Sequence, residues 1–345
     1  MNMLAMSPAE PAVWFPTIRA GTGADVYVER LCAGLNACGV RTEISWLPHR
    51  AEYLPWSVPA PPPPTWATIV HVNTWLHRRF IPMELPVVTT MHLCVHDPAL
   101  SPYKSAAQSW YHRSWVKRTE AYGLRRAQRI VSVSHYTADR TREAFGVRDV
   151  QVIHNGVPLP DDIGTLPARI LHAPFRLLYV GNWSLRKGVD LLSPIMEKLG
   201  SDYELLYTAD AHGAHRKMNL PDNCRCMGRL DQAQMRSAYR ESDGLIFPSR
   251  LEGLPLTVIE AMAQGLPVVC ARSSSIPEII EDGLDGALVG LDDIDGYCDA
   301  VRSLATCPGL ATRRSLAGAS RVEEHFSEER MVLAYLDLYR GMLDQ

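Results

Sequence analysis

The stretch from Phe247 to Val269 constrains the fold more than any other part of the chain. An apolar segment at 244–247 predicts a buried strand, and a polar loop follows it. Pro255 suits the first turn of a helix, where the N–H that proline lacks would be unpaired, and Gly265 suits the residue just past a helix end. A second strand is expected from Pro267. The sequence therefore predicts a strand–loop–helix–strand unit.

Two carboxylates frame this loop and helix. Glu252 precedes the helix and Glu260 lies about two turns into it, with the backbone N–H groups of Gly253 and its neighbours between them. The positive end of the helix dipole lies behind these N–H groups and favours an anion. A diphosphate could bind there, with one carboxylate on each side to accept hydrogen bonds from hydroxyl groups. The alternative is an ordinary helix with two solvated acids. The surrounding motifs favour the anion site over this alternative.

The stretch resembles the E-x7-E segment of the retaining glycosyltransferases of family 4, which have the GT-B fold. Further motifs in the family's order strengthen the resemblance, continuously in the C-terminal half and at scattered points before it. They are residues 154–157 (family P-N-G-V), 180–189 (family V-G-R-L…K-G), 276–278 and 282–286. The resemblance implies an α/β protein with two Rossmann-like, doubly wound domains that face a central cleft.

The length of the chain agrees with two domains. A chain of 345 residues, 46% of them hydrophobic, can form two separate cores. A stretch rich in proline and glycine after residue 157 marks the connector between them. We expect an N-terminal acceptor domain at 1–160 and a C-terminal nucleotide-sugar domain at 170–326. By the resemblance, a final helix at 327–345 crosses back to the N-terminal domain.

Two features of the N-terminal domain could contact a ligand. A turn with Gly21 and Gly23 follows the first predicted strand, but the third glycine of the dinucleotide fingerprint is missing, which disfavours a nicotinamide or flavin site. His92 directly follows a predicted strand at 87–91, where open α/β sheets bind ligands. The resemblance implies that the turn contacts donor and acceptor and that His92 reaches the donor sugar. His96 is a second candidate, and either histidine could be structural.

The phosphate-binding residues are expected in the C-terminal domain. Lys187 follows a strand and a turn, so its ammonium can meet the phosphates, and Arg186 beside it can assist or point to solvent. The family more often has an arginine where this chain has Asn182. Arg186 or Arg250 would have to replace that phosphate contact, or it is missing.

The resemblance also assigns the remaining donor contacts. Glu252, with the backbone of Gly253 and Leu254, would hold the sugar hydroxyls, Glu260 would accept from the ribose hydroxyls, and the loop at Gly228 would lie where the base is read. We therefore assign catalysis to His92, Lys187 and Glu252, and donor binding to Gly21, Gly23, Arg186, Gly228, Gly253, Leu254 and Glu260.

No metal ion or other cofactor is expected. The metal-dependent GT-A enzymes need an Asp-x-Asp motif at a strand end, and this chain has none there. Its Asp161-Asp162 and Asp292-Asp293 pairs fall in predicted loops. The nucleotide-sugar is a co-substrate, and lysine and helix N–H groups would replace a divalent ion.

Composition limits where the protein works. No run approaches the ~18 apolar residues of a membrane span, and the first residues lack the pattern of a signal peptide, which favours the cytoplasm. The net charge of -3 and the lack of a concentrated basic face argue against nucleic-acid binding. Residues 103–129 predict a basic, aromatic helical stretch, which suits either an anionic membrane surface or a solvated helix face.

The sequence predicts a retaining hexosyltransferase. It would move a hexose from a UDP- or GDP-sugar to a lipid-linked or glycan acceptor in the synthesis of cell-surface polysaccharide or lipopolysaccharide. A GT-B nucleotide-sugar epimerase is an alternative, and so is a non-catalytic nucleotide-sugar-binding subunit. The complete set of Lys187, Glu252 and Glu260 disfavours the non-catalytic reading.

Overall fold

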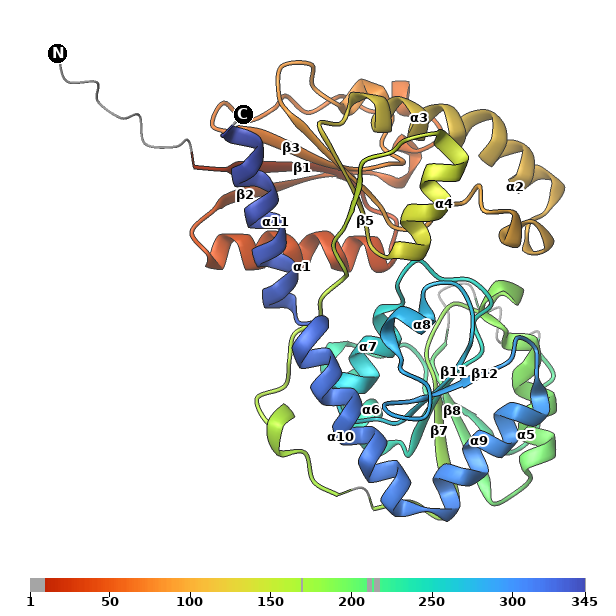
Figure 1. Cartoon of the computed structure of the whole chain (residues 1–345). Coiled ribbons are helices and arrows are strands. Elements are labelled where there is room, and N and C mark those ends of the chain that lie inside the picture. The colour runs from red at the N-terminus through yellow and green to blue at the C-terminus, as the bar shows by residue number, and fades with distance from the viewer. Residues whose placement is uncertain (1–9, 169, 210–212, 214–217, 345) are drawn as a thin grey trace. The chain divides into compact units, whose positions relative to one another are not determined.

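The computed structural model describes residues 10–168, 170–209, 213 and 218–344 (Figure 1). Their contacts divide the chain into two compact units. The first unit contains the described residues up to Gly156 and returns at Glu328, and the second unit is Val157–Ser327. Each unit has its own six-stranded sheet.

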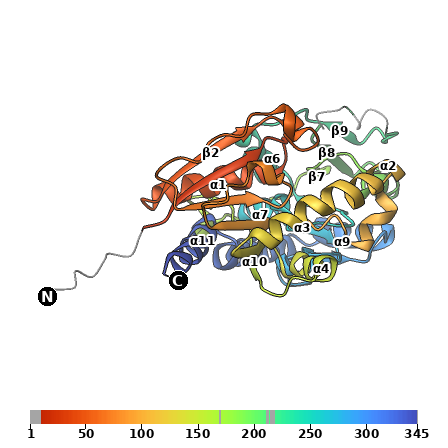
Figure 2. The ribbon, with the colours of Figure 1, turned by 90° about the horizontal axis from the view of Figure 1, so that it is seen from above.

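The sheet of the first unit is parallel throughout and has the order β2-β1-β3-β4-β5-β6 (Figure 1). β3 and β4 are rich in β-branched residues and lie in the middle of this order, and all but one of their residues are buried, as in a sheet covered on both faces. β2 lies at the edge of the sheet and is largely half-buried or exposed (Figure 2). The strands are β1 (Ala12–Ile18), β2 (Arg41–Leu47), β3 (Ile69–Asn73), β4 (Val87–Met91), β5 (Arg129–Ser132) and β6 (Val150–Val152).

The last helix of the chain packs in the core of the first unit. Its buried face joins the same hydrophobic cluster as β1 and α1. Gly34 makes this packing possible, because a Cβ at that position would lie 2.3 Å from Val332 Cγ2. The helices of this unit are α1 (Gly23–Ala37), α2 (Ala106–Tyr111), α3 (Lys117–Arg126), α4 (His135–Phe145) and α11 (Glu328–Leu343).

The second unit repeats the parallel design with the order β12-β11-β10-β7-β8-β9. β7, β10 and β11 lie side by side, and all but one of their residues are buried. The strands are β7 (Phe175–Tyr179), β8 (Tyr203–Tyr207), β9 (Cys224–Cys226), β10 (Gly244–Phe247), β11 (Val268–Ala271) and β12 (Ala287–Val289), and the helices are α5 (Leu192–Leu199), α6 (Gln232–Glu241), α7 (Leu256–Ala263), α8 (Ile276–Ile279), α9 (Ile294–Thr306) and α10 (Pro308–His325).

The prediction of two Rossmann-like α/β domains is confirmed by these two parallel sheets. The prediction of one helical stretch at 103–129 is wrong in detail. A π-helical turn at His112–Val116 separates α2 from α3, Ala127 is extended, and Arg129 already belongs to β5. Among the described residues, no helix is both long enough and apolar enough to cross a membrane.

Candidate functional site

The predicted strand–loop–helix–strand unit is β10, the loop 248–255, α7 and β11. Pro255 is the residue that caps α7, one position before the first turn that the sequence predicted for it. Gly265 follows the helix with a φ of +68°, a left-handed conformation that favours glycine. Because five of the eight residues of α7 are buried, this helix fixes the position of the loop before it.

Lys187, from the turn at Leu185–Lys187, contacts Glu252 in this loop. Lys187 Nζ lies 2.5 Å from Glu252 Oε1, and Arg186 Nη1 lies 3.5 Å from Glu252 Oε2. The Glu252 residue is buried, and only 14% of the Lys187 side chain is exposed. Two cations and one carboxylate therefore form a compact, nearly dry cluster.

Serine side chains hold Glu252 on three sides. Ser249 Oγ donates to the carboxylate at 2.5 Å, Ser274 Oγ accepts from the Glu252 N–H at 2.9 Å, and Ser275 Oγ donates to the Glu252 carbonyl at 3.2 Å. The sequence analysis did not find these serines. The run of three serines at 273–275, one residue after the strand at 268–271, is the signal that could have pointed to Ser274 and Ser275.

Close backbone packing positions Lys187. Gly188 has a φ of +70°, and a Cβ on it would lie 2.1 Å from the Pro248 carbonyl oxygen, so only glycine fits there. The Arg250 N–H donates to the Arg186 carbonyl at 2.8 Å, and Arg186 Nη1 donates to the Leu251 carbonyl at 2.5 Å. The turn that carries Lys187 is thereby joined to the loop that carries Glu252.

Burial and charge act on both members of the pair. Burial lowers the pKa of Lys187, and the repulsion from Arg186 adds to this, against the opposing attraction of Glu252. Burial by itself raises the pKa of Glu252, but the charges of Lys187 and Arg186 and two hydrogen bonds outweigh it and leave that pKa below its usual value. The carboxylate is therefore ionised at neutral pH.

Arg250 has a structural role, unlike Arg186. Its guanidinium makes a bidentate contact of 2.7 Å with Asp190 and lies 2.6 Å from Asp292. Asn182, which stands where the family more often has arginine, is exposed. Of the two arginines that could replace that phosphate contact, only Arg186 contacts Glu252.

Glu260 lies on α7, two turns beyond the Lys187–Glu252 pair. Its carboxylate accepts a hydrogen bond from the buried Tyr239 at 3.2 Å and remains half-buried. Gly253 and Leu254 are buried in the loop before the helix. Gly228 follows β9 with a φ of +76°, and its carbonyl accepts from the Ala209 N–H at 2.8 Å.

In the glycine turn of the first unit, a carboxylate of the protein already occupies backbone N–H groups. Gly21 has a φ of +69° and Gly23 begins α1. The Asp25 carboxylate accepts from the N–H groups of Ala20 at 3.1 Å and Gly21 at 2.7 Å. A phosphate at these two groups would have to displace Asp25, so this turn is less suited to phosphate than the loop at Glu252.

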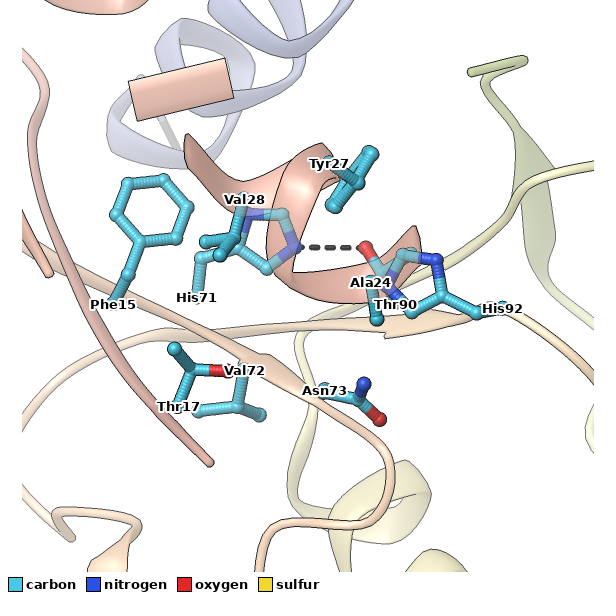
Figure 3. Close-up of a pocket in the computed structure, with 10 residues that line it drawn as sticks. All are labelled: Phe15, Thr17, Ala24, Tyr27, Val28, His71, Val72, Asn73, Thr90 and His92. Atoms are coloured by element: carbon cyan, nitrogen blue, oxygen red, sulfur yellow. Dashed lines mark hydrogen bonds between the residues drawn. The ribbon is translucent and has the colours of Figure 1, made fainter. Parts of the chain in front are cut away.

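His92 lines a small cavity in the first unit, shown in Figure 3. The cavity has a volume of about 20 Å³, which is about the room of one water molecule. The Tyr27 ring contacts His92 edge-on at 4.6 Å between centroids, and burial lowers the pKa of His92 to about 4. The cavity is lined by Phe15, Thr17, Ala24, Tyr27, Val28, His71, Val72, Asn73, Thr90 and His92.

A buried hydrogen-bond relay adjoins this cavity. His71 Nδ1 lies 2.6 Å from the Tyr339 hydroxyl, His71 Nε2 lies 2.7 Å from Thr90 Oγ1, and Thr90 Oγ1 lies 3.1 Å from the Tyr335 hydroxyl. Burial, with a smaller contribution from His92, lowers the pKa of His71 to about 3. The imidazole is therefore neutral at neutral pH.

His96, the second candidate, has a different environment. His96 Nε2 lies 2.9 Å from Glu120 Oε2, and the other oxygen of this fully buried carboxylate accepts from Thr74 at 3.1 Å. His96 therefore holds a buried acid, while His92 lines the cavity. The structure brings Arg186, Lys187 and Glu252 into one cluster, and it places His92, Gly21 and Gly23 in the other unit.

Comparison with known proteins agrees with this arrangement. A family model described as Glycosyl transferases group 1 matches residues 174–307, and one described as Glycosyltransferase Family 4 matches residues 64–160. Together they match more than half of the chain.

Two curated proteins are similar in sequence. Alpha-maltose-1-phosphate synthase of Mycobacterium tuberculosis is 28% identical over 79% of this chain and 79% of its own length. The GDP-mannose:cellobiosyl-diphosphopolyprenol alpha-mannosyltransferase of Xanthomonas oryzae pv. oryzae is 25% identical over 70% of this chain and 66% of its own length.

Solved structures of glycosyltransferases share the fold. Sucrose-phosphate synthase of Thermosynechococcus elongatus matches with a TM-score of 0.78 and 19% identity, over 97% of this chain and 100% of its own. HepE of Anabaena, in complex with UDP and glucose, matches with a TM-score of 0.68 and 14% identity, over 96% of this chain and 100% of its own. This chain belongs to the family 4 glycosyltransferases and has their GT-B fold.

Proposed function

We propose that this glycosyltransferase is a retaining enzyme that moves a hexose from a UDP- or GDP-sugar to a lipid-linked or glycan acceptor in cell-surface polysaccharide synthesis. The observation that carries the proposal is the contact of Lys187 and Arg186 with Glu252 next to the start of α7. A sugar diphosphate has charged oxygens that suit the two cations and hydroxyl groups that suit the carboxylate.

In this proposal, the two cations act on the leaving group. Negative charge grows on the diphosphate as its bond to the anomeric carbon breaks, and positive groups already in position stabilise that charge. Lys187 is well suited because its side chain is mostly removed from water, where electrostatic attraction is stronger. These side chains and the start of α7 supply the positive charge, so the reaction needs no metal ion.

Glu252 would hold the sugar. Its Oε1 already accepts from Lys187 and Ser249, whereas Oε2 has Arg186 at 3.5 Å and retains room for hydroxyl donors. Ser249 holds the carboxylate, and Ser274 and Ser275 hold the Glu252 backbone, before the donor arrives. A sugar held in one orientation presents its anomeric carbon to the acceptor hydroxyl, which lowers the entropic part of the barrier.

Glu260 would bind the ribose of the donor, with its carboxylate oriented by Tyr239. The loop at Gly228 is our proposed site for the base, and we assign His92 to the sugar because it is neutral and directly follows β4. The names of the relatives support a nucleotide-sugar donor and a lipid-linked acceptor, since one uses GDP-mannose and a diphosphopolyprenol and another was solved with UDP.

A ligand screen followed by a transfer assay tests this function. UDP, GDP and ADP are compared for the rise they cause in the melting temperature, because a ligand that binds only the native state stabilises it. The preferred nucleotide then selects the sugar donors for an assay with diphosphopolyprenol-linked and oligosaccharide acceptors. We expect transfer with the anomeric configuration kept, as read by NMR of the product.

Each alternative gives a different result in the same assay. Release of the nucleotide and conversion of the sugar without any acceptor would identify an epimerase. Donor binding without turnover, for every acceptor tried, would favour a binding subunit. An inverted product would contradict the retaining mechanism while leaving the transferase intact.

A further inference from the structure

Four large apolar side chains of the first unit are 49% to 65% exposed: Tyr53, Leu54, Trp56 and Trp110. We refer to them as the aromatic patch. Removing side chains of this size from water is favourable, so their exposure indicates a surface that becomes covered. None of them takes part in the donor cluster or in the His92 cavity.

Three of these residues, Tyr53, Leu54 and Trp56, lie in one segment that hydrogen bonds anchor to a helical stretch. The segment 49–57 is anchored on the helical stretch 106–116, because Trp115 Nε1 donates to the Glu52 carbonyl at 2.9 Å and the Tyr111 hydroxyl donates to the Glu52 carboxylate at 3.1 Å. Trp110 directly precedes Tyr111 on α2. The two segments are therefore joined by hydrogen bonds, and each carries exposed members of the aromatic patch.

Stacked rings hold Trp56 in place at the surface. The Trp115 and His77 rings stack with their centroids 5.5 Å apart and their planes 7° apart, and Trp56 packs edge-on against both, at 5.8 Å and 5.4 Å. The indole of Trp56 thus stands on an aromatic base and remains largely exposed. A side chain held outward in this way loses little entropy on contact with a partner.

Exposed basic residues occur in and next to the segments that carry the patch. They lie on 49–57, directly after His77, or on the helical stretch that continues from 106–116 into α3: Arg50, Arg78, Arg79, Arg113, Lys117 and Arg118. Glu52 is the only acid in residues 49–57 and 103–118 of the sequence, and its carboxylate is held by Tyr111 and lies 3.4 Å from His49. The surface therefore combines aromatic rings with a strong excess of positive charge.

We propose that this surface binds the headgroup region of an anionic lipid bilayer. Tryptophan and tyrosine rings favour the boundary between headgroups and acyl chains, and each basic residue near such a surface adds electrostatic attraction to anionic lipids. The proposal extends the proposed function, from which it takes the lipid-linked acceptor. It replaces the wider stretch 103–129, since Arg126 donates to the carbonyls of Met83 and Leu85, and Glu120 and Leu124 are buried.

The test is co-flotation of the full chain with vesicles. We expect binding to vesicles that contain phosphatidylglycerol, much weaker binding to phosphatidylcholine alone, and a decline as salt rises, because ions screen exposed charges. Leu54→Ser/Trp56→Ser should lower the bound fraction at least about tenfold. Lys117→Glu/Arg118→Glu should do the same.

Two matched variants carry equivalent changes on the second unit. Leu284→Ser/Leu316→Ser removes two exposed leucines, and Arg236→Glu/Arg313→Glu reverses two exposed charges. Both should bind vesicles like the parent protein. Melting temperatures of all variants check that the patch variants fold.

Three outcomes would overturn the proposal: a parent protein that does not float with anionic vesicles at low salt, patch variants that bind as well as the parent, or self-association that the patch variants abolish. The last outcome would make the surface a protein interface. The melting shift caused by the preferred nucleotide is measured for every variant, so a failure of membrane binding remains distinct from a failure of the donor site.

Discussion

In the second unit, the buried site contains an ion pair between Lys187 and Glu252. In the first unit, His71 of β3 and His92 directly after β4 are neutral, with pKa values of about 3 and about 4. Both groups are buried, so burial alone does not separate them. The difference lies in the partners that each group has.

Glu252 faces two cations and an O–H donor, and their attraction exceeds the cost of its burial. His71 faces a tyrosine and a threonine, neither of which carries a charge that would stabilise an imidazolium. Charged partners therefore keep a buried group ionised, whereas neutral partners leave a buried histidine uncharged.

Lys187→Ala should give the largest effect on kcat. In the proposed mechanism, it removes the positive charge that stabilises the negative charge growing on the leaving diphosphate in the transition state. We expect kcat to fall about 10²–10³-fold. Lys198→Ala is the matched control, since Lys198 is an exposed lysine of the same unit that pairs with Asp295. Steady-state kinetics at saturating donor measure both, and a Lys187 variant with nearly full kcat would remove this residue from the mechanism.

Glu260→Ala should act on binding instead of chemistry. A hydrogen bond to a charged group contributes about 1.5–3 kcal/mol, so the KM for the donor should rise about 10–100-fold with kcat little changed. Tyr239→Phe, which removes the donor that orients this carboxylate, should give a smaller rise. If KM stays constant while kcat falls, the assignment to the ribose is wrong.

Sequence reasoning went furthest where local pattern and packing agree. The buried strands β4, β10 and β11 follow from short runs of apolar and β-branched residues alone. β2 was not predicted, because an edge strand with a solvated side has few apolar residues to mark it. Helix breaks such as the π-helical turn at His112–Val116 leave no clear signal in composition.

The candidate site was predictable only in part, because its remaining contacts join distant segments. The Lys187–Glu252 pair was anticipated as two separate residues, and their direct contact was not. The relay from His71 to Tyr339 joins positions 268 residues apart. Asp25 occupies N–H groups of the glycine turn, and this depends on the direction of one side chain, which spacing does not specify.

Acid should destabilise the first unit through its neutral histidines. An unfolded histidine has a pKa of about 6.5, so between about pH 6.5 and pH 4 the unfolded chain binds protons that folded His71 and His92 do not. The free energy of unfolding should therefore decrease as the pH is lowered, by up to about 1.4 kcal/mol per pH unit for each histidine.

Urea unfolding at several pH values measures this slope. A His92→Asn variant should have a shallower slope than the parent, because one of the two groups no longer titrates. His325→Asn is the control, since this exposed histidine lies on the second unit and should leave the slope unchanged. Equal slopes for parent and His92→Asn would contradict the neutral state assigned to this side chain.

The smallest effect is expected from chelation. In the proposed mechanism, Lys187, Arg186 and the start of α7 supply the positive charge for the diphosphate, and the aspartate pairs of the sequence have other contacts. Asp162 pairs with Arg240 at 2.6 Å, Asp292 pairs with Arg250 at 2.6 Å, and Asp293 caps α9. Turnover should therefore be the same with and without EDTA. A complete loss that Mg²⁺ restores would show that a metal ion supplies charge we assign to Lys187 and Arg186, and the contrast between the two units would then rest on the ion as well.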